Sequence, residues 1–201
     1  MFQKLKLTNN VFYQEIIEEN FDLRKKSLIS YYRGHWQDTK YIDREDKFLL
    51  NKLNRNLEIK KNLDSIKNES VMIHIRREKY ENKIIGIEYY ENALKRLEKK
   101  YHNLELNLFT DDESIVEQLS FKESLNSINF PKDENYNTLK TFSKMLNNKH
   151  FVIANSTFSY MAALLGAEQD STVIMPKPWM KNMNYNLSLS SWIEINCKFE
   201  L

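Results

Sequence analysis

From Val71 onward, the sequence alternates between short apolar runs and longer segments whose apolar side chains recur with helical spacing. The strand-like runs are residues 71–75, 104–110, 151–154 and 172–175, and the helix-like segments are residues 88–101, 139–146 and 158–165. Parallel strands need long crossover connections, usually helices, so this alternation predicts a parallel sheet. We therefore expect an α/β fold for this part of the chain.

Three further features of this region carry local predictions. Residues 122–135 are largely polar, which predicts a loop. Pro176 lacks a backbone N–H group, so we expect it to stop the strand that precedes it. Asp111 and Asp112 follow a strand-like run and predict the start of a helix, because acidic residues favour the positive end of a helix.

The first third of the chain is mostly polar, and we expect it to be mainly helical. Between residues 38 and 63 the apolar side chains lie roughly on one helical face. Residues 60–69 are typical of a helix end and a linker. The sequence thus predicts two parts, residues 1–68 and residues 69–201.

Composition excludes some classes of function. Charged residues make up 29% of the chain but the net charge is only +2, which argues against a nucleic-acid surface. The single cysteine, Cys197, excludes an internal disulfide framework and fits a reducing compartment. We find neither a signal peptide nor an apolar run long enough to cross a bilayer. The expectation is a cytoplasmic protein, with peripheral contact to the inner face of the membrane left open.

Two apolar runs that end abruptly in polar residues point to a ligand site. The run from Val71 ends in His74, Arg76 and Arg77, and the run from Phe151 ends in residues 155–159, Asn-Ser-Thr-Phe-Ser. Ligands of open α/β sheets bind beyond the carboxyl ends of the strands, so both polar ends are expected at one crevice. An imidazole, guanidinium groups, an amide and hydroxyl groups together suit a nucleotide diphosphate.

Arg76 and Arg77 are the strongest candidates for phosphate contact, because a guanidinium matches phosphate oxygens with a planar fork. Adjacent strand residues point in different directions, so we expect one arginine to meet phosphate and the other to brace the loop. A surface ion-pair cluster is the equally weighted alternative. His74 could contact a base, or it could be a structural residue of the strand. No second histidine or cysteine stands at the spacing of metal ligands.

The remaining candidates have structural alternatives. Ser156 or Thr157 could cap the following helix, whose exposed N–H groups would bind an anion, and capping alone is the alternative. Asn155 could simply close a turn. Asp111 and Asp112 could contact a ribose or a metal, but helix capping is the favoured interpretation.

Taken together, these segments resemble the α-1,2-fucosyltransferases of glycosyltransferase family 11. Residues 74–80, His-Ile-Arg-Arg-Glu-Lys-Tyr, resemble the family's His-x-Arg-Arg-Gly-Asp-Tyr motif. The further matches come in the family's order: Trp36-Gln37, Lys40-Tyr41, residues 86–90, residues 109–112, Lys149-His150, residues 153–159, residues 173–176, Trp179 and residues 191–193. The resemblance covers roughly residues 30–195.

The resemblance implies a GT-B-type glycosyltransferase, in which a Rossmann-like domain binds the donor GDP-fucose and an inverting, metal-independent reaction passes L-fucose to the 2-hydroxyl of a galactoside. It implies no cofactor and a place in surface-glycan (O-antigen or lipopolysaccharide) synthesis. By motif, Arg76 and Arg77 would be catalytic and hold the diphosphate, and His74 would contact the nucleotide. The other implied donor-binding residues are Asp111, Asp112, Asn155, Ser156, Thr157 and Phe158.

Three departures from the family pattern matter. Glu78-Lys79 replaces Gly-Asp, which changes the local charge by two units, and Tyr160-Met161 replaces an aromatic pair. The family's glycine-rich N-terminal segment is not found, so we expect a nearly complete donor half with a remnant of the acceptor half. Two alternatives therefore stay open: a catalytically inactive nucleotide-sugar-binding remnant, and a generic α/β domain whose arginines serve only ion pairs.

Overall fold

The computed structural model describes residues 13–17, 29–33, 69–77, 84–130, 137–181 and 187–200. The chain divides into two compact units, Met1–Ile42 and Asp43–Leu201. The predicted boundary between residues 68 and 69 stays a prediction, because residues 34–68 lie outside the described part.

The first unit contains two parallel strands, β1 (Tyr13–Ile17) and β2 (Ile29–Arg33), paired from Tyr13 with Ile29 to Ile17 with Arg33. The mainly helical character expected here is not confirmed, since both described segments are strands. Aromatic and β-branched residues in Tyr-Gln-Glu-Ile-Ile and Ile-Ser-Tyr-Tyr-Arg suit extended backbone. The helix expected between residues 38 and 63 falls outside the described residues.

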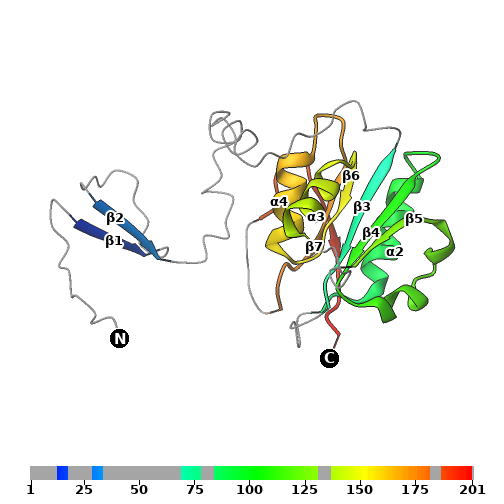
Figure 1. The fold of residues 1–201 in the computed structure, drawn as a ribbon, viewed down its shortest axis with the longest axis horizontal. Coiled ribbons are helices and arrows are strands. Elements are labelled where there is room, and N and C mark those ends of the chain that lie inside the picture. Colours follow the sequence, from blue (N-terminus) through cyan, green and yellow to red (C-terminus); the bar gives the residue numbers. More distant parts are fainter. Residues whose placement is uncertain are drawn as a thin grey trace. The chain divides into compact units, whose positions relative to one another are not determined.

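The second unit is built on a six-stranded sheet in which every pair of neighbours is parallel (Figure 1). Its strands are β3 (Ser70–Ile75), β4 (Glu105–Thr110), β5 (Leu125–Asn129), β6 (His150–Val152), β7 (Val173–Lys177) and β8 (Ile193–Asn196). The spatial order β5-β4-β3-β6-β7-β8 is that of a doubly wound, Rossmann-like sheet, with its switch point between β3 and β6. The predicted parallel α/β fold is therefore confirmed, and the GT-B pairing of two such domains stays a prediction.

Helices cover both faces of this sheet (Figure 1): α2 (Ile87–Glu98) lies on one face, and α3 (Thr138–Leu146) and α4 (Thr157–Gly166) lie on the other. The main apolar core joins α2 to the β3 side chains Val71, Ile73 and Ile75. Side chains alternate along a strand, so Met72 and His74 face α3 and α4. This alternation decides which residues at the end of β3 reach the pocket described below.

Two predictions about the strands were wrong. The predicted loop over residues 122–135 contains β5, an edge strand whose polar sequence gives little apolar signal. Pro176 lies inside β7 and does not end it. The backbone of Lys177 pairs with the β8 side, where its carbonyl accepts from Cys197 N. Successive residues of a strand direct their backbone groups to opposite sides, so the backbone of Pro176 is directed toward β6. Because β6 has already ended at Val152, no N–H donor is required from Pro176.

Candidate functional site

A pocket opens at the carboxyl ends of β3, β4 and β5, on the face covered by α3 and α4. Its lining combines a guanidinium, a carboxylate, an imidazole, an amide and two hydroxyl groups with apolar walls. The lining residues are His74, Arg76, Phe109, Thr110, Asp111, Asn129, Thr141, Met145 and Phe158. This is the edge of the sheet at which the sequence predicted a ligand site.

Arg76 and Asp111 form an ion pair at this edge. Ile75 pairs with Thr110, so the next residue of each strand lies beside the other. Arg76 Nη1 lies 2.7 Å from Asp111 Oδ2, and the Asp111 side chain is 4% exposed while that of Arg76 is 33% exposed. The carboxylate is therefore buried, and the guanidinium keeps a solvent-accessible surface at the pocket.

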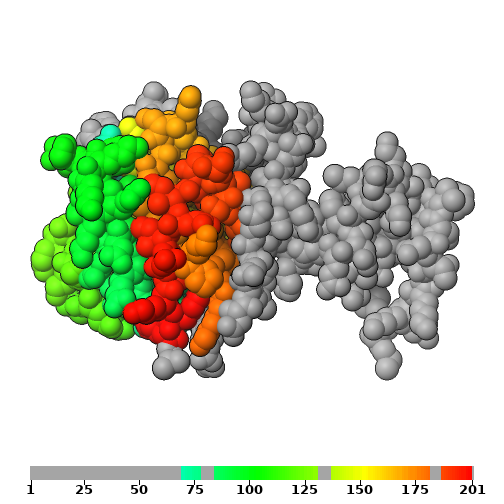
Figure 2. Space-filling view, turned by 180° about the vertical axis from the view of Figure 1, so that it is seen from behind, coloured from blue at the N-terminus to red at the C-terminus, as the bar shows by residue number. Residues whose placement is uncertain are grey.

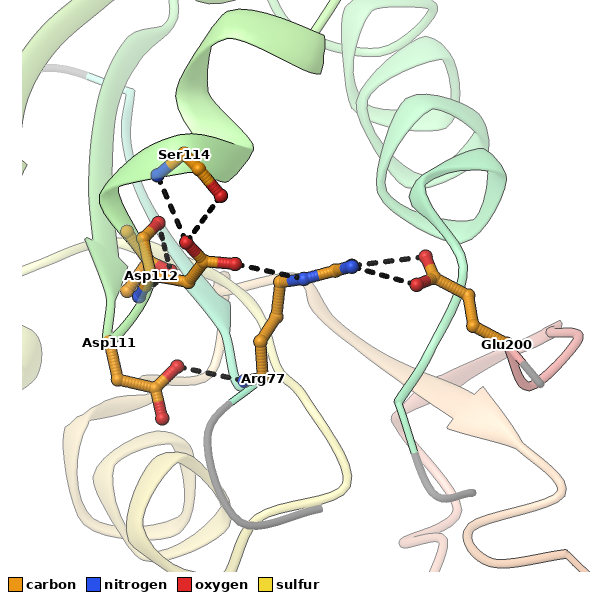
Figure 3. Close-up of polar contacts among 6 residues, drawn as sticks. Arg77, Asp111, Asp112, Ser114 and Glu200 are labelled. Atoms are coloured by element: carbon orange, nitrogen blue, oxygen red, sulfur yellow. Dashed lines mark hydrogen bonds and ion pairs between the residues drawn. The ribbon is translucent and has the colours of Figure 1, made fainter. Parts of the chain in front are cut away.

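The side chain of Arg77 is held by Glu200 and Asp112 (Figure 3). Its Nη1 and Nη2 donate to the two carboxylate oxygens of Glu200 at 3.0 and 2.8 Å, and its Nε lies 3.2 Å from Asp112 Oδ2. The hydrogen bonds that Arg77 donates to Glu200 raise the pKa of the Arg77 guanidinium. Arg77 is not among the residues that line the pocket, and its predicted contact with the donor diphosphate stays a prediction.

Asp111 and Asp112 have different surroundings, although they are adjacent. Asp111 accepts the backbone N–H of Arg77 at 2.8 Å, in addition to its ion pair with Arg76. Asp112 caps the 3₁₀-helix η4 (Glu113–Gln118) by accepting from Ser114 N at 2.9 Å and Ser114 Oγ at 2.6 Å. These hydrogen bonds from Ser114 and the nearby Arg77 lower the pKa of Asp112. The capping interpretation therefore holds for Asp112, while Asp111 lines the pocket.

His74 reaches the pocket from the face of β3 opposite the main apolar core. Its ring packs edge-on against Phe158 of α4, with 6.5 Å between centroids. Burial, together with the nearby charge of Arg76, lowers the pKa of His74 to about 3. Among the described residues, no hydrogen-bond partner reaches His74 Nδ1. The imidazole is thus neutral near pH 7 and retains hydrogen-bonding capacity at Nδ1.

The segment from Asn155 to Phe158 leads from β6 into α4 at the switch point of the sheet. Ser156 is the N-cap residue of α4, but its side chain makes no capping hydrogen bond. Ser156 therefore occupies the predicted N-cap position, without the side-chain hydrogen bond that usually accompanies it. Thr157 is the first residue of α4, and Asn155 and Ser156 are buried. The N–H groups of the first helical turn are the kind of donors that bind an anion.

Tyr89 of α2 fixes the start of this segment from behind the sheet. Its buried hydroxyl lies 2.8 Å from the Ile153 carbonyl and 3.1 Å from the Ile174 carbonyl, both of which accept from it. This hydroxyl thus ties α2 to the residue that follows β6 and to the beginning of β7. Tyr89 was not predicted as part of the site, and the sequence analysis includes it only among residues 86–90, which resemble the family.

Five lining residues are absent from the predicted site, and two of these, Asn129 and Thr141, were missed because β5 and the site-facing side of α3 were not recognised. Asn129 ends β5, where its Oδ1 accepts from Lys144 Nζ at 2.9 Å and its Nδ2 donates to the Leu108 carbonyl at 3.2 Å. Thr141 contributes from α3. Recognising a third strand before α3 would have placed Asn129 at the same sheet edge as Arg76 and Asp111.

Comparison with known proteins assigns a family. Residues 3–196 match the sequence profile of Glycosyl transferase family 11. The chain belongs to glycosyltransferase family 11. The predicted family is confirmed.

Two characterised family 11-type relatives come from Escherichia coli. An α-1,2-colitosyltransferase is 26% identical over 198 residues, covering 92% of this chain and 68% of the relative. The O-antigen biosynthesis glycosyltransferase WbnK is 28% identical over 134 residues, covering 61% of this chain and 43% of the relative. A crystal structure of AibC is similar at a TM-score of 0.36 and 11% identity, over 71% of this chain and 39% of that one.

The residues that resemble family 11 motifs do not all meet at the pocket. Lys149 and His150 lie at the opposite edge of the sheet, where His150 Nδ1 accepts from Thr172 N at 3.0 Å and its Nε2 lies 2.5 Å from Glu69 Oε2. Tyr101 stacks on this fully buried ring with 4.2 Å between centroids. We interpret this cluster as support for the strand starts. Glu78 and Lys79 lie outside the described residues.

Within the described part of this family 11 chain, no three His, Cys, Asp or Glu side chains are grouped so that they could hold a metal ion. Metal independence stays a prediction. None of the described helices is long and apolar enough to span a membrane.

Proposed function

We propose that this chain transfers L-fucose from GDP-fucose to the 2-hydroxyl of a galactoside during O-antigen synthesis. Family 11 membership supports glycosyl transfer, and WbnK, one of the two relatives, is named for O-antigen biosynthesis. The other relative is named as a colitosyltransferase, so colitose is the main alternative to fucose as the transferred sugar. The proposed reaction inverts the configuration at the sugar carbon.

The observation that carries this proposal is the position of Arg76. Its guanidinium stands at the carboxyl end of β3, beside the switch point, and is held by a buried carboxylate 2.7 Å away. In the proposed reaction the acceptor oxygen bonds to the sugar carbon, the bond to the GDP oxygen breaks, and the acceptor hydroxyl releases its proton. Negative charge then grows on GDP, and a fixed guanidinium stabilises that charge without reorganising.

Other residues of the edge have proposed roles in donor binding. The first turn of α4, from Ser156 to Phe158, would donate N–H groups to a phosphate. His74, neutral and partly without hydrogen-bond partners, would contact the nucleoside beside Phe158. Asp111 would orient Arg76, and Asn155 would line the approach to the phosphates. Asp112 and Arg77, whose side chains are held by Ser114 and Glu200, would support this arrangement from outside the pocket.

Calorimetric titration with GDP-fucose, GDP-colitose, GDP and UDP tests the proposal. We expect the guanine ligands to bind and UDP to bind at least tenfold more weakly. Arg76→Ala should reduce GDP affinity by about 10- to 100-fold, because a charge-assisted contact is lost. Arg96→Ala, at an exposed position near the end of α2, is the matched control and should bind as the unaltered chain does. Unchanged GDP affinity in Arg76→Ala would refute the proposed site.

A donor-binding protein without transferase activity is the second candidate, and Lys79 favours it. The family motif carries an acid where this chain has Lys79, beside the predicted phosphate-binding arginines. If that acid serves turnover, then GDP-fucose should bind but fucose should not be transferred, and Lys79→Asp should restore transfer. Transfer by the unaltered chain at a rate equal to that of Lys79→Asp would exclude this candidate.

A further inference from the structure

The segment Cys197–Glu200 is fixed by backbone pairing with the residues that precede α2. Gly86 N donates to the Lys198 carbonyl at 2.9 Å, and Glu200 N donates to the Ile84 carbonyl at 2.8 Å. Ile85 and Phe199 form the antiparallel bridge between them. Figure 2 shows the C-terminal residues in red directly beside the green of α2. The backbone of Glu200 is therefore anchored independently of its side chain.

The side chain of Glu200 uses both of its oxygens on Arg77, 123 residues earlier in the chain. The two hydrogen bonds are 3.0 and 2.8 Å long and form a bidentate pair (Figure 3). The Arg77 side chain is 16% exposed and that of Glu200 is 36% exposed. Partial burial and bidentate geometry distinguish this pair from an ordinary surface ion pair.

Arg77 passes this constraint to the pocket through Asp111. Its backbone N–H donates to Asp111 Oδ1 at 2.8 Å, while the other oxygen of the same carboxylate meets Arg76 Nη1 at 2.7 Å. Fixing the Arg77 side chain at Glu200 and Asp112 therefore also fixes the backbone that holds Asp111. The continuous series is Glu200, Arg77, Asp111 and Arg76, and only its last two residues line the pocket.

We propose that Glu200 is a positioning residue for the donor site and acts on Arg76 through Arg77 and Asp111. The inference rests on the proposed function, in which Arg76 meets the donor diphosphate. It assigns Arg77 a bracing role and leaves phosphate contact to Arg76. Glu200 lies beyond the residues that match the family profile, which end at residue 196. Glu200 is therefore brought to the site by the tertiary structure and is not part of a family motif.

Glu200→Gln tests the inference by removing the charge while keeping the size of the side chain. We expect it to weaken GDP binding about five- to tenfold, within the usual range for coupled neighbours. Glu88→Gln is the matched control, because Glu88 is a carboxylate on the same surface whose cation partner, Lys198, is 4.0 Å away and exposed. This control should bind GDP as the unaltered chain does. Equal affinities in all three chains would overturn the inference and leave the proposed function standing.

A double-mutant cycle separates positioning through Arg77 from a general structural effect. In an Arg77→Met background, Glu200→Gln should weaken GDP binding by less than twofold more, because the intermediary is already lost. Fully additive effects would contradict the proposed route through Arg77.

Amide hydrogen exchange gives a readout that does not depend on GDP. Glu200→Gln should increase exchange in peptides covering residues 72–77 and 109–115, and leave α3 and α4 unchanged. If the unaltered chain binds no nucleotide, the proposed function fails, and exchange alone decides whether Glu200 orders this edge. Unchanged exchange at both peptides would overturn the inference in that case.

Discussion

Arg76 and Asp111 meet across two adjacent parallel strands, one residue beyond the last pair of the ladder, with 2.7 Å between Nη1 and Oδ2. Asp111 also accepts the Arg77 backbone N–H, so one buried carboxylate serves a side chain and a main chain. Asp111 therefore couples the backbone conformation at Arg77, just after β3, to the direction of the Arg76 guanidinium at the pocket.

Asp111→Asn should destabilise the domain and weaken GDP binding together. An amide cannot accept both hydrogen bonds with full charge, and its NH₂ group would face a donor, at a cost of about 1–3 kcal/mol in the free energy of unfolding. Urea unfolding and calorimetry with GDP measure the two effects. Asp170→Asn, at an exposed partner of Lys149 on the opposite edge, should change stability by less than about 0.5 kcal/mol. Equal stability of the two variants would contradict the role of Asp111.

His74 should make stability fall as the pH is lowered. Its folded pKa of about 3 lies below the unfolded value of 6.5, so the unfolded chain binds the extra proton between these values. Stability from this residue is complete above pH 6.5 and declines by at most about 1.4 kcal/mol per pH unit below it. Unfolding titrations between pH 7 and pH 4 should show a shallower decline in His74→Gln. His102→Gln, at an exposed position, should keep the slope of the unaltered chain.

Gly166→Ala should destabilise the packing of α4 on the sheet. A Cβ atom at this position would lie 2.8 Å from Phe151 Cζ and 3.0 Å from the Leu146 carbonyl oxygen. Overpacking of this kind costs about 1–3 kcal/mol, measurable as a lower urea midpoint. Gly86→Ala is the control, because its Cβ would meet only the Lys198 oxygen at 3.5 Å. Similar midpoints for both variants would show that α4 shifts to accept the methyl group.

Tyr89→Phe should affect both stability and donor binding. The loss of the hydroxyl removes a hydrogen bond from the buried Ile153 carbonyl, at a cost of about 1–2 kcal/mol, and loosens the entry to α4. Tyr101→Phe is the matched variant, since its hydroxyl bonds Thr172 near the opposite edge. We expect Tyr101→Phe to lower stability without weakening GDP binding. An unchanged GDP affinity in Tyr89→Phe would separate Tyr89 from the site.

The central strands and helices of the second unit could be predicted because their signals are local. The apolar runs at β3, β4 and β6 and the helical spacing of α2 and α3 are visible in the sequence itself. The edge strands β5 and β8 were missed, because an edge strand buries less and its alternation includes exposed polar residues. Pro176 was predicted to end β7 because it lacks a backbone N–H group. A strand can nevertheless contain proline where the neighbouring strand has already ended, and the end of β6 cannot be read from the sequence around Pro176.

The candidate site was predictable where it follows strand ends and not where it depends on tertiary contacts. Arg76, His74 and Asp111 directly follow or belong to recognisable strands, so the fold rule placed them at one edge. The different partners of Arg76 and Arg77 follow from side-chain alternation, which the sequence analysis anticipated without deciding between them. Glu200 carried no local signal, because its partner is 123 residues away. The predictions for residues 34–68 and for Glu78-Lys79 stay untested.

The distance along the chain between Arg77 and Glu200 has a consequence for biosynthesis. A ribosome adds residues in order, so β3 and the Arg77 that follows it are synthesised well before Glu200. During that interval the Arg77 guanidinium lacks the Glu200 carboxylate. The pocket edge of the nascent domain can therefore be completed only after the later segment has been synthesised. Completion of the pocket edge is thereby tied to translation as far as residue 200, and prematurely terminated chains would present the same motif without the Glu200 carboxylate.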